Sequence, residues 1–215
     1  MKARQAASIA AGLLLAAAAW AGPAEDFAAG RAAYDRGDVR TAISILGKSA
    51  DAGHSPSQVL LGEILDLAEQ NEDAVRYYRL ASDQGNLDGT YGLALMYAGG
   101  EGVPKDPRKA RELIQKAAEG GHVQATHALA AAYIGGGLAM TEEERASPAA
   151  LGWIEKSASA DSLPAIDRLA VAYRKGDFGV AADPKKAEAL EARARVLRNV
   201  KSVKAGKNGK KKPNG

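Results

Sequence analysis

The three histidines of this chain are the residues best suited to bind a metal, and their positions argue against a shared site. His54 and His122 occupy equivalent turns of an internal repeat, and His127 lies inside a predicted helix. Equivalent positions of a repeat are separated by at least one repeat, whereas zinc needs three or four convergent ligands. Cysteine is absent, so thiolate ligands and a disulfide framework are excluded. We expect no metal site.

Two short glycine motifs match phosphate-binding loops only in part. Gly47-Lys48-Ser49 resembles the end of a P-loop, but Ala42 stands where the upstream glycine is needed, and the segment has helical periodicity. Gly100-Glu101-Gly102 does not follow a predicted strand, as a dinucleotide-binding motif would. We therefore expect no nucleotide cofactor.

The 26 acidic residues contain no recognisable catalytic pair. Most stand at helix starts or at exposed helical positions, where hydration and the helix dipole account for them. We expect a protein that is not an enzyme. A hydrolase built on converging carboxylates is the third choice among the functions considered.

The strongest charge feature is a lysine-rich segment at the C-terminal end. Residues 200–215 also contain Gly, Asn and Pro and lack an apolar face, so we expect them to be disordered. The chain as a whole carries +3, but without this segment and the N-terminal segment it is net acidic. The alternatives for the tail are anionic lipid headgroups, an envelope polysaccharide, the protein's own acidic body, or solvent alone; nucleic acid is not expected. The lysines are Lys201, Lys204, Lys207, Lys210, Lys211 and Lys212.

Residues 1–21 have the features of an export signal. Lys2 and Arg4 precede an apolar run, and Ala19-Trp20-Ala21 fits the small-x-small rule for signal peptidase. The run is too short for a stable membrane span. We expect cleavage before Gly22 and a periplasmic or secreted protein, with an uncleaved anchor as the alternative.

An internal period organises the rest of the chain. An alanine is followed eleven residues later by a residue at a turn, and this happens five times. A fixed period of this kind indicates stacked repeats rather than one globular core. The pairs are Ala42 and Gly53, Ala74 and Gly85, Ala110 and Gly121, Ala150 and Asp161, and Ala187 and Arg198; the earlier helix of each repeat carries Tyr34, Leu65, Tyr97, Tyr133 or Tyr173.

Each repeat is predicted to be two helices. Apolar residues recur at spacings of three and four, and breakers separate the runs. Asp106-Pro107 and Asp183-Pro184 are helix-start signals, and Gly at a helix end favours the left-handed conformation that stops it. Only the loop inside each hairpin varies in length, as stacked repeats allow. We expect an all-α solenoid of about five hairpins over residues 22–199.

The run from Gly92 to Ala110, Gly-Leu-Ala-Leu-Met-Tyr-Ala-Gly-Gly-Glu-Gly-Val-Pro-Lys-Asp-Pro-Arg-Lys-Ala, closely resembles the Sel1-like repeat, a relative of the tetratricopeptide repeat. The fourth and fifth repeats also match well. The first resembles the shorter tetratricopeptide form, and the second lacks the tyrosine, having Leu65, and the glycine-rich loop. The resemblance implies a right-handed α-solenoid.

The resemblance also implies a partner-binding groove on the first helices. Its residues stand two, six and nine places after a small residue near each helix start, and we call these positions two, six and nine. The expected charge is concentrated at the two ends, with an apolar and aromatic centre. The residues are Val59, Glu63 and Asp66; Tyr91, Leu95 and Ala98; His127, Ala131 and Ile134; Asp167, Val171 and Arg174.

Two expectations concern the core and its end. Tyr97, Tyr133 and Tyr173 are expected to pack between repeats. We call the alanine that opens each eleven-residue interval the marker alanine. Four places after it the other repeats have an apolar residue, but the fifth has Glu191, so stacking should stop near Asn199.

The function implied is that of an exported, non-catalytic scaffold or adaptor for protein or peptide partners, since related periplasmic repeat proteins support sensor-kinase control or exopolysaccharide assembly. A binder of cell-wall or exopolysaccharide material is the alternative.

Overall fold

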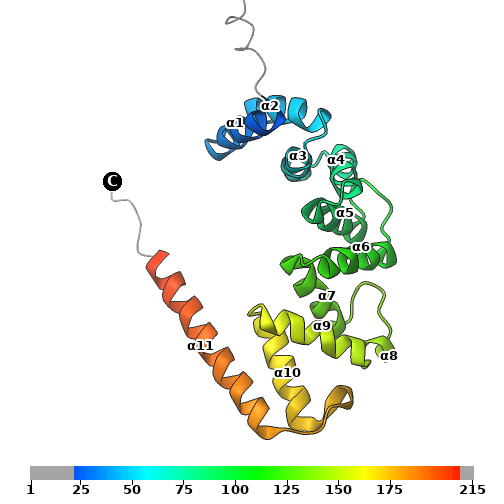
Figure 1. The fold of residues 1–215 in the computed structure, drawn as a ribbon, viewed down its shortest axis with the longest axis vertical. Helices are drawn as coiled ribbons and strands as arrows, with labels where there is room; N and C mark the ends of the chain where they lie inside the picture. The colour runs from blue at the N-terminus through cyan, green and yellow to red at the C-terminus, as the bar shows by residue number, and fades with distance from the viewer. Residues whose placement is uncertain (1–21, 209–215) are drawn as a thin grey trace, which may run out of the picture. The chain divides into compact units, whose positions relative to one another are not determined.

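The computed structural model describes residues 22–208, which are almost entirely helical (Figure 1). The predicted export signal and Lys210, Lys211 and Lys212 lie outside these residues. No strand occurs within them. The helices are α1 (Pro23–Asp35), α2 (Val39–Asp51), α3 (Ser55–Leu67), α4 (Asn71–Asp83), α5 (Leu87–Gly99), α6 (Pro107–Glu119), α7 (Val123–Gly135), α8 (Glu142–Arg145), α9 (Pro148–Ser159), α10 (Leu163–Lys175) and α11 (Pro184–Asn208), with a 3₁₀ turn η1 (Asp177–Gly179).

The chain divides within α5 into two compact units, one up to residue 92 and one from residue 93. In the first unit α1 packs on α2, α2 on α3 and α3 on α4. In the second, α6 packs on α7, α7 on α9, α9 on α10 and α10 on α11. Within each unit these helices thus pack on the next helix in sequence, and the described residues form an all-α array of helical hairpins, as an α-solenoid requires.

The marker alanines form the centre of the packing. All five have an exposed fraction of 0%. The residue four places later is buried in the first four repeats, whereas Glu191 is half-buried and binds Arg174 at 2.6 Å. The buried residues are Leu46, Tyr78, Ile114 and Ile154. The eleven-residue period therefore reflects a small residue that is fully buried at the same place of every repeat.

Successive hairpins meet through pairs of small, buried residues spaced eight apart, which we call junction pairs. One member ends the second helix of a hairpin, and the other begins the first helix of the next. At the second junction, a Cβ added to Gly89 would lie 2.5 Å from the Cβ of Ala81, so the backbones are too close for larger side chains. The pairs are Ser49 and Ser57, Ala81 and Gly89, Ala117 and Ala125, and Ser157 and Ala165.

Helix starts and ends agree with the sequence signals. The Asp106 carboxylate accepts hydrogen bonds from the backbone N–H groups of Arg108 and Lys109, and Asp38 accepts one from Thr41. The turns between hairpins take positive φ at Gly53, Gly85, Gly121 and Asp161, where φ lies between 62° and 96°. Among these four turns, Asp161 is the residue that takes the left-handed conformation without being a glycine.

The repeat tyrosines are less buried than expected. Tyr97, Tyr133 and Tyr173 are half-buried, whereas Met96, beside Tyr97, is 1% exposed. The reason is the phenol group, which needs a polar partner: the Tyr173 hydroxyl donates to Glu155 at 3.2 Å. These rings cover the edge of the core rather than filling it.

The last helix corrects the predicted boundary of the tail. We expected irregular chain from residue 200, but α11 continues to Asn208. Residues 200–205 contain no glycine or proline, and Val, Lys and Ala are compatible with a helix already started upstream. Lys201, Lys204 and Lys207 therefore lie on α11. Within the described residues, no helix is both long and apolar enough to cross a lipid bilayer.

Candidate partner-binding site

Position six is the one predicted groove position that is exposed in all four first helices. Leu95 on α5 is 47% exposed and Val171 on α10 is 40% exposed. Glu63 on α3 and Ala131 on α7 are exposed as well. Helices α7 and α10 are in contact. Exposed leucine and valine at equivalent places of successive repeats indicate a surface that can bury apolar area against a partner.

Position two does not belong to that surface. Val59 is only 8% exposed and is part of the core, so its assignment to the groove is wrong. Tyr91 is half-buried, and burial raises the pKa of its hydroxyl. His127 is also half-buried, and its Nδ1 is 2.8 Å from the hydroxyl of Ser157. The cause is the place along the helix: position two lies about one turn before position six, close to the junction pair, where successive hairpins pack together.

In the first unit, position six introduces a carboxyl group. Partial burial raises the pKa of Glu63, Arg31 opposes the shift and Asp88 adds to it. Asp66, at position nine, is half-buried. Positions six and nine of α3 are therefore both acidic, as the sequence shows.

In the last hairpin, the predicted groove charges are already paired. Asp167 accepts a hydrogen bond from Arg198 at 2.5 Å, and Arg174 binds Glu191 at 2.6 Å. Both partners lie on α11, and the order of the two contacts shows that α11 runs antiparallel to α10. These charges hold the last helix, which leaves Val171 as the exposed groove residue of this repeat that is not engaged in an ion pair.

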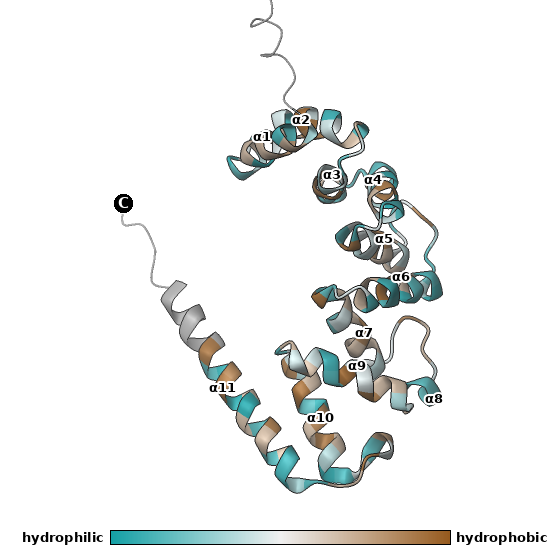
Figure 2. Ribbon diagram, viewed as in Figure 1, coloured by the Kyte–Doolittle hydropathy of each residue, from teal (hydrophilic) through white to brown (hydrophobic). Residues whose placement is uncertain are grey.

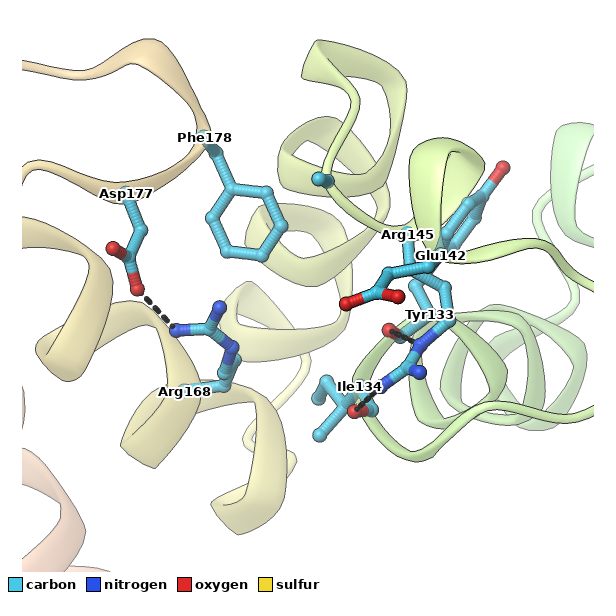
Figure 3. Close-up of a pocket in the computed structure, with 8 residues that line it drawn as sticks. Tyr133, Ile134, Glu142, Arg145, Arg168, Asp177 and Phe178 are labelled. Carbon is cyan, nitrogen blue, oxygen red and sulfur yellow. Dashed lines mark hydrogen bonds and ion pairs between the residues drawn. The ribbon is translucent and has the colours of Figure 1, made fainter.

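A pocket lies beside this surface, at the loops inside the fourth and fifth hairpins (Figure 3). Its volume is about 330 Å³. Ile134, which holds position nine on α7, is one of its walls; Ala98, at the same position on α5, is half-buried. The lining residues are Tyr133, Ile134, Glu142, Arg145, Ala146, Arg168, Asp177 and Phe178.

The two arginines of the pocket are held in place by different means. Arg145 donates to the carbonyl oxygens of Tyr133 and Ile134, at 3.1 and 2.9 Å, and so satisfies the end of α7. Arg168 donates to Asp177 at 3.0 Å, and its guanidinium carbon lies 4.5 Å from the centre of the Phe178 ring. Figure 3 shows the Glu142 carboxylate directed toward the space between Arg168 and Ile134.

The loop inside the fourth hairpin builds one side of this pocket. The loop between α7 and α9 contains α8, which starts at a capping box between Thr141 and Glu144. The Arg111 guanidinium binds Glu144 at 3.0 Å and contributes to a lowered pKa of that carboxyl, mainly set by the Thr141 backbone N–H. The sequence analysis did not predict this pocket. Loop length was the available signal, since these are the longest loops.

The polar side chains of the described residues do not form the arrangement that a metal site requires. No three His, Asp or Glu residues converge there to hold a metal ion. Every buried polar side-chain atom described has a hydrogen-bond partner. His54 and His122 act locally: His54 Nδ1 is 2.9 Å from the hydroxyl of Ser57, and His122 Nδ1 accepts from the backbone N–H of Ala125 at 3.0 Å.

Comparison with protein families identifies Sel1 repeats at residues 57–86, 87–122 and 163–190. The second repeat, which we expected to diverge, is among those matched. Among curated proteins, chitin synthase regulatory factor 3 of Schizosaccharomyces pombe is 32% identical over 138 residues. That alignment covers 62% of this chain but only 14% of the yeast protein.

Solved structures show the same fold. A protective antigen of uropathogenic Escherichia coli strains, which has an SLR fold, aligns with a TM-score of 0.71 and 26% identity, over 80% of this chain and 38% of the antigen. A Sel1 repeat protein of Oxalobacter formigenes aligns with a TM-score of 0.62 and 24% identity, over 80% of this chain and 70% of that one. A putative Sel1 repeat protein of Klebsiella pneumoniae gives 0.52 and 19% identity, over 81% and 86%.

Proposed function

Because this chain belongs to the Sel1-like repeat family, we propose that it is a non-catalytic scaffold or adaptor that binds a protein or peptide partner through position six of its first helices. Sel1 repeats generally mediate protein–protein interactions. The fold alone does not select a partner, so the surface must do so.

The observation that carries the proposal is the exposure of position six in four successive first helices. Three of these residues are apolar, Leu95, Ala131 and Val171, while the fourth, Glu63, is acidic. Apolar side chains at one repeat position have no packing role when they face solvent, and a partner that covers them gains free energy from their burial. In the first unit, Glu63 favours contact with a basic residue of a partner, and in the second unit the exposed position-six residues favour apolar residues.

The pocket supports a more specific mode of binding. Ile134 belongs to both the position-nine set and the pocket wall, so a segment lying on position six of α7 and α10 passes beside the pocket. Apolar surface with a few fixed polar groups is typical of sites that orient a bound chain. Arg168 and Glu142 supply those groups.

Photocrosslinking tests the surface directly. A photoreactive residue placed at 95, 131 or 171 should capture the same partner, whereas one at Leu80, which is 40% exposed on the second helix α4, should not. Leu95→Asp with Val171→Asp should weaken binding by roughly 30-fold for each side chain that is a hot spot of about 2 kcal/mol. Equal capture from the control position would contradict the proposal, and retention of glycan without protein would favour the polysaccharide-binding alternative.

We also propose that the protein acts in the cell envelope after export, with the lysine-rich segment contacting an anionic polymer or lipid headgroups. The support is the sequence of residues 1–21 and the charge of residues 201–212. Intact-mass measurement of protein from the periplasmic fraction should give a chain that begins at Gly22. A chain that retains residues 1–20 would contradict cleavage.

A further inference from the structure

The last helix presents two different faces. Ala187 and Ala194 are 0% exposed, and Leu190 and Leu197 pack on the core cluster around Ile154 and Ile166. Val196 and Val200 are 61% and 46% exposed. Val196 follows Ala187 by nine residues, which in an α-helix places it about half a turn away around the axis. The valines therefore form an apolar stripe on the face opposite the core, which we call the outer face of α11.

The orientation of this face is fixed by ion pairs. Arg193 binds Asp161 and Arg198 binds Asp167, each at 2.5 Å. The first ion pair ties α11 to the turn before α10, and the second ties it to α10 itself. The helix therefore cannot rotate to bury its valines without breaking these ion pairs. The outer face is a stable feature of the second unit rather than a disordered surface.

The length of α11 adds a second property. Each of the other hairpin helices has 12 or 13 residues, whereas α11 has 25. Since Arg198 lies opposite Asp167, the helix extends past the level at which α10 begins at Leu163 (Figure 1). This extension carries Lys201, Lys204 and Lys207, and three more lysines follow in the sequence. Figure 2 shows polar and apolar residues alternating along the helix up to that point.

We propose that the outer face of α11 lies on an anionic lipid surface, with Val196 and Val200 at the boundary between headgroups and acyl chains and the lysines among the headgroups. An apolar stripe on a helix whose sequence continues into a lysine-rich segment is the combination that an interfacial helix needs, because the apolar area and the attraction to anionic lipid each supply part of the affinity. A charged polysaccharide would use the lysines alone and would gain nothing from the valines. The observation that selects lipid is therefore the exposure of the two valines on a basic helix.

The predicted association is peripheral and reversible. Two valines bury little apolar area, so the lysines must contribute most of the affinity, at about fivefold in partitioning for each basic residue near the surface. Added salt should therefore release the protein. This inference makes specific the charge contact proposed for the lysine-rich segment, and it does not depend on partner binding at position six.

The test uses residues 22–215 and vesicles of phosphatidylcholine with and without phosphatidylglycerol. The wild type should sediment with the phosphatidylglycerol vesicles only, and less so in high salt. Val196→Gln with Val200→Gln should reduce partitioning by about tenfold or more if both side chains enter the boundary. Lys201→Gln, Lys204→Gln and Lys207→Gln together should reduce it by roughly 100-fold. Val123→Gln is the matched control, because Val123 is 47% exposed on α7, and it should bind as the wild type does.

A probe on the helix gives a second measurement that does not depend on the stability of the variants. The chain has no cysteine, so Val200→Cys can carry a single environment-sensitive fluorophore. Its emission should shift to the blue on phosphatidylglycerol vesicles, while the same fluorophore at Val123→Cys should not shift.

Two outcomes would overturn the inference. If the double valine variant binds as tightly as the wild type and the fluorophore at residue 200 stays in water, the lysines act by charge alone. If the protein is retained by dextran sulfate but by neither kind of vesicle, the ligand is an anionic polymer. In both cases the proposed role of position six would be unaffected.

Discussion

The turns between hairpins and the loops inside hairpins connect the same kind of helix, but they obey different constraints. At each turn a junction pair of small residues eight apart holds two backbones close together. The loops inside hairpins range from the short turn after Leu67 to the segment that contains α8. The turns set the geometry of the array, so they tolerate few residue types. The loops are free to vary, and they form the pocket.

The largest expected effect comes from the core between hairpins. The Tyr78 ring fills the space above two glycines: a Cβ on Gly62 would lie 2.9 Å from it, and one on Gly92 2.6 Å. Tyr78→Ala should lower the free energy of unfolding by about 3–5 kcal/mol, because no neighbouring side chain can occupy that volume. Urea denaturation followed by circular dichroism measures this. Tyr133→Ala, at a half-buried tyrosine, should cost clearly less, and equal losses would contradict the assignment of the core.

A junction pair is the next most sensitive place. Ala165→Leu inserts a large side chain where the exposed fraction is 0%, and overpacking of this kind costs about 1–3 kcal/mol. Ala149→Leu, on the exposed side of α9, is the control and should change stability by less than about 0.5 kcal/mol. Thermal denaturation of the two variants in the same buffer should give a lower melting temperature for Ala165→Leu. Similar melting temperatures would show that the junctions are not close-packed.

A substitution in the short loop after α3 should have a smaller effect and should increase the stability of the fold. Glu69 has φ of 59°, in the left-handed region that glycine adopts without strain. Glu69→Gly should therefore raise stability by up to about 1 kcal/mol, offset in part by the greater freedom of glycine in the unfolded chain. Chemical denaturation measures the change. A marked loss of stability would mean that the Glu69 side chain makes contacts that outweigh the strain.

The smallest effect concerns pH. Partial burial raises the pKa of Glu63 above its usual value of 4.5. A carboxyl whose pKa is raised on folding favours the folded state while it is protonated, and this contribution is lost as the pH rises from 4.5 through the raised value. Glu63→Gln should remove this part of the pH dependence and leave the rest of the curve unchanged. Denaturation curves across that range test it; an unchanged slope would place Glu63 in ordinary solvent.

The sequence was sufficient for most features that depend on local periodicity, although the period also placed Arg198 at a turn and this residue lies inside α11. The marker alanines, the aspartate caps and the left-handed turn at Asp161 all follow from short-range rules, and each is confirmed. Val59 was misplaced because helix position alone does not tell which neighbouring helix covers a residue. The pocket was missed because Arg145, Arg168 and Phe178 come together only through the paths of two long loops, which no repeat period encodes.

The junction pairs constrain how repeats can be gained or lost by recombination during evolution. The two members of a pair belong to different hairpins, so a crossover at a turn would separate residues that must fit together. A crossover in a loop inside a hairpin keeps every pair whole. The segment that can be duplicated or deleted with least damage is therefore a second helix, the turn after it and the following first helix, such as α6 with α7 joined through Ala117 and Ala125.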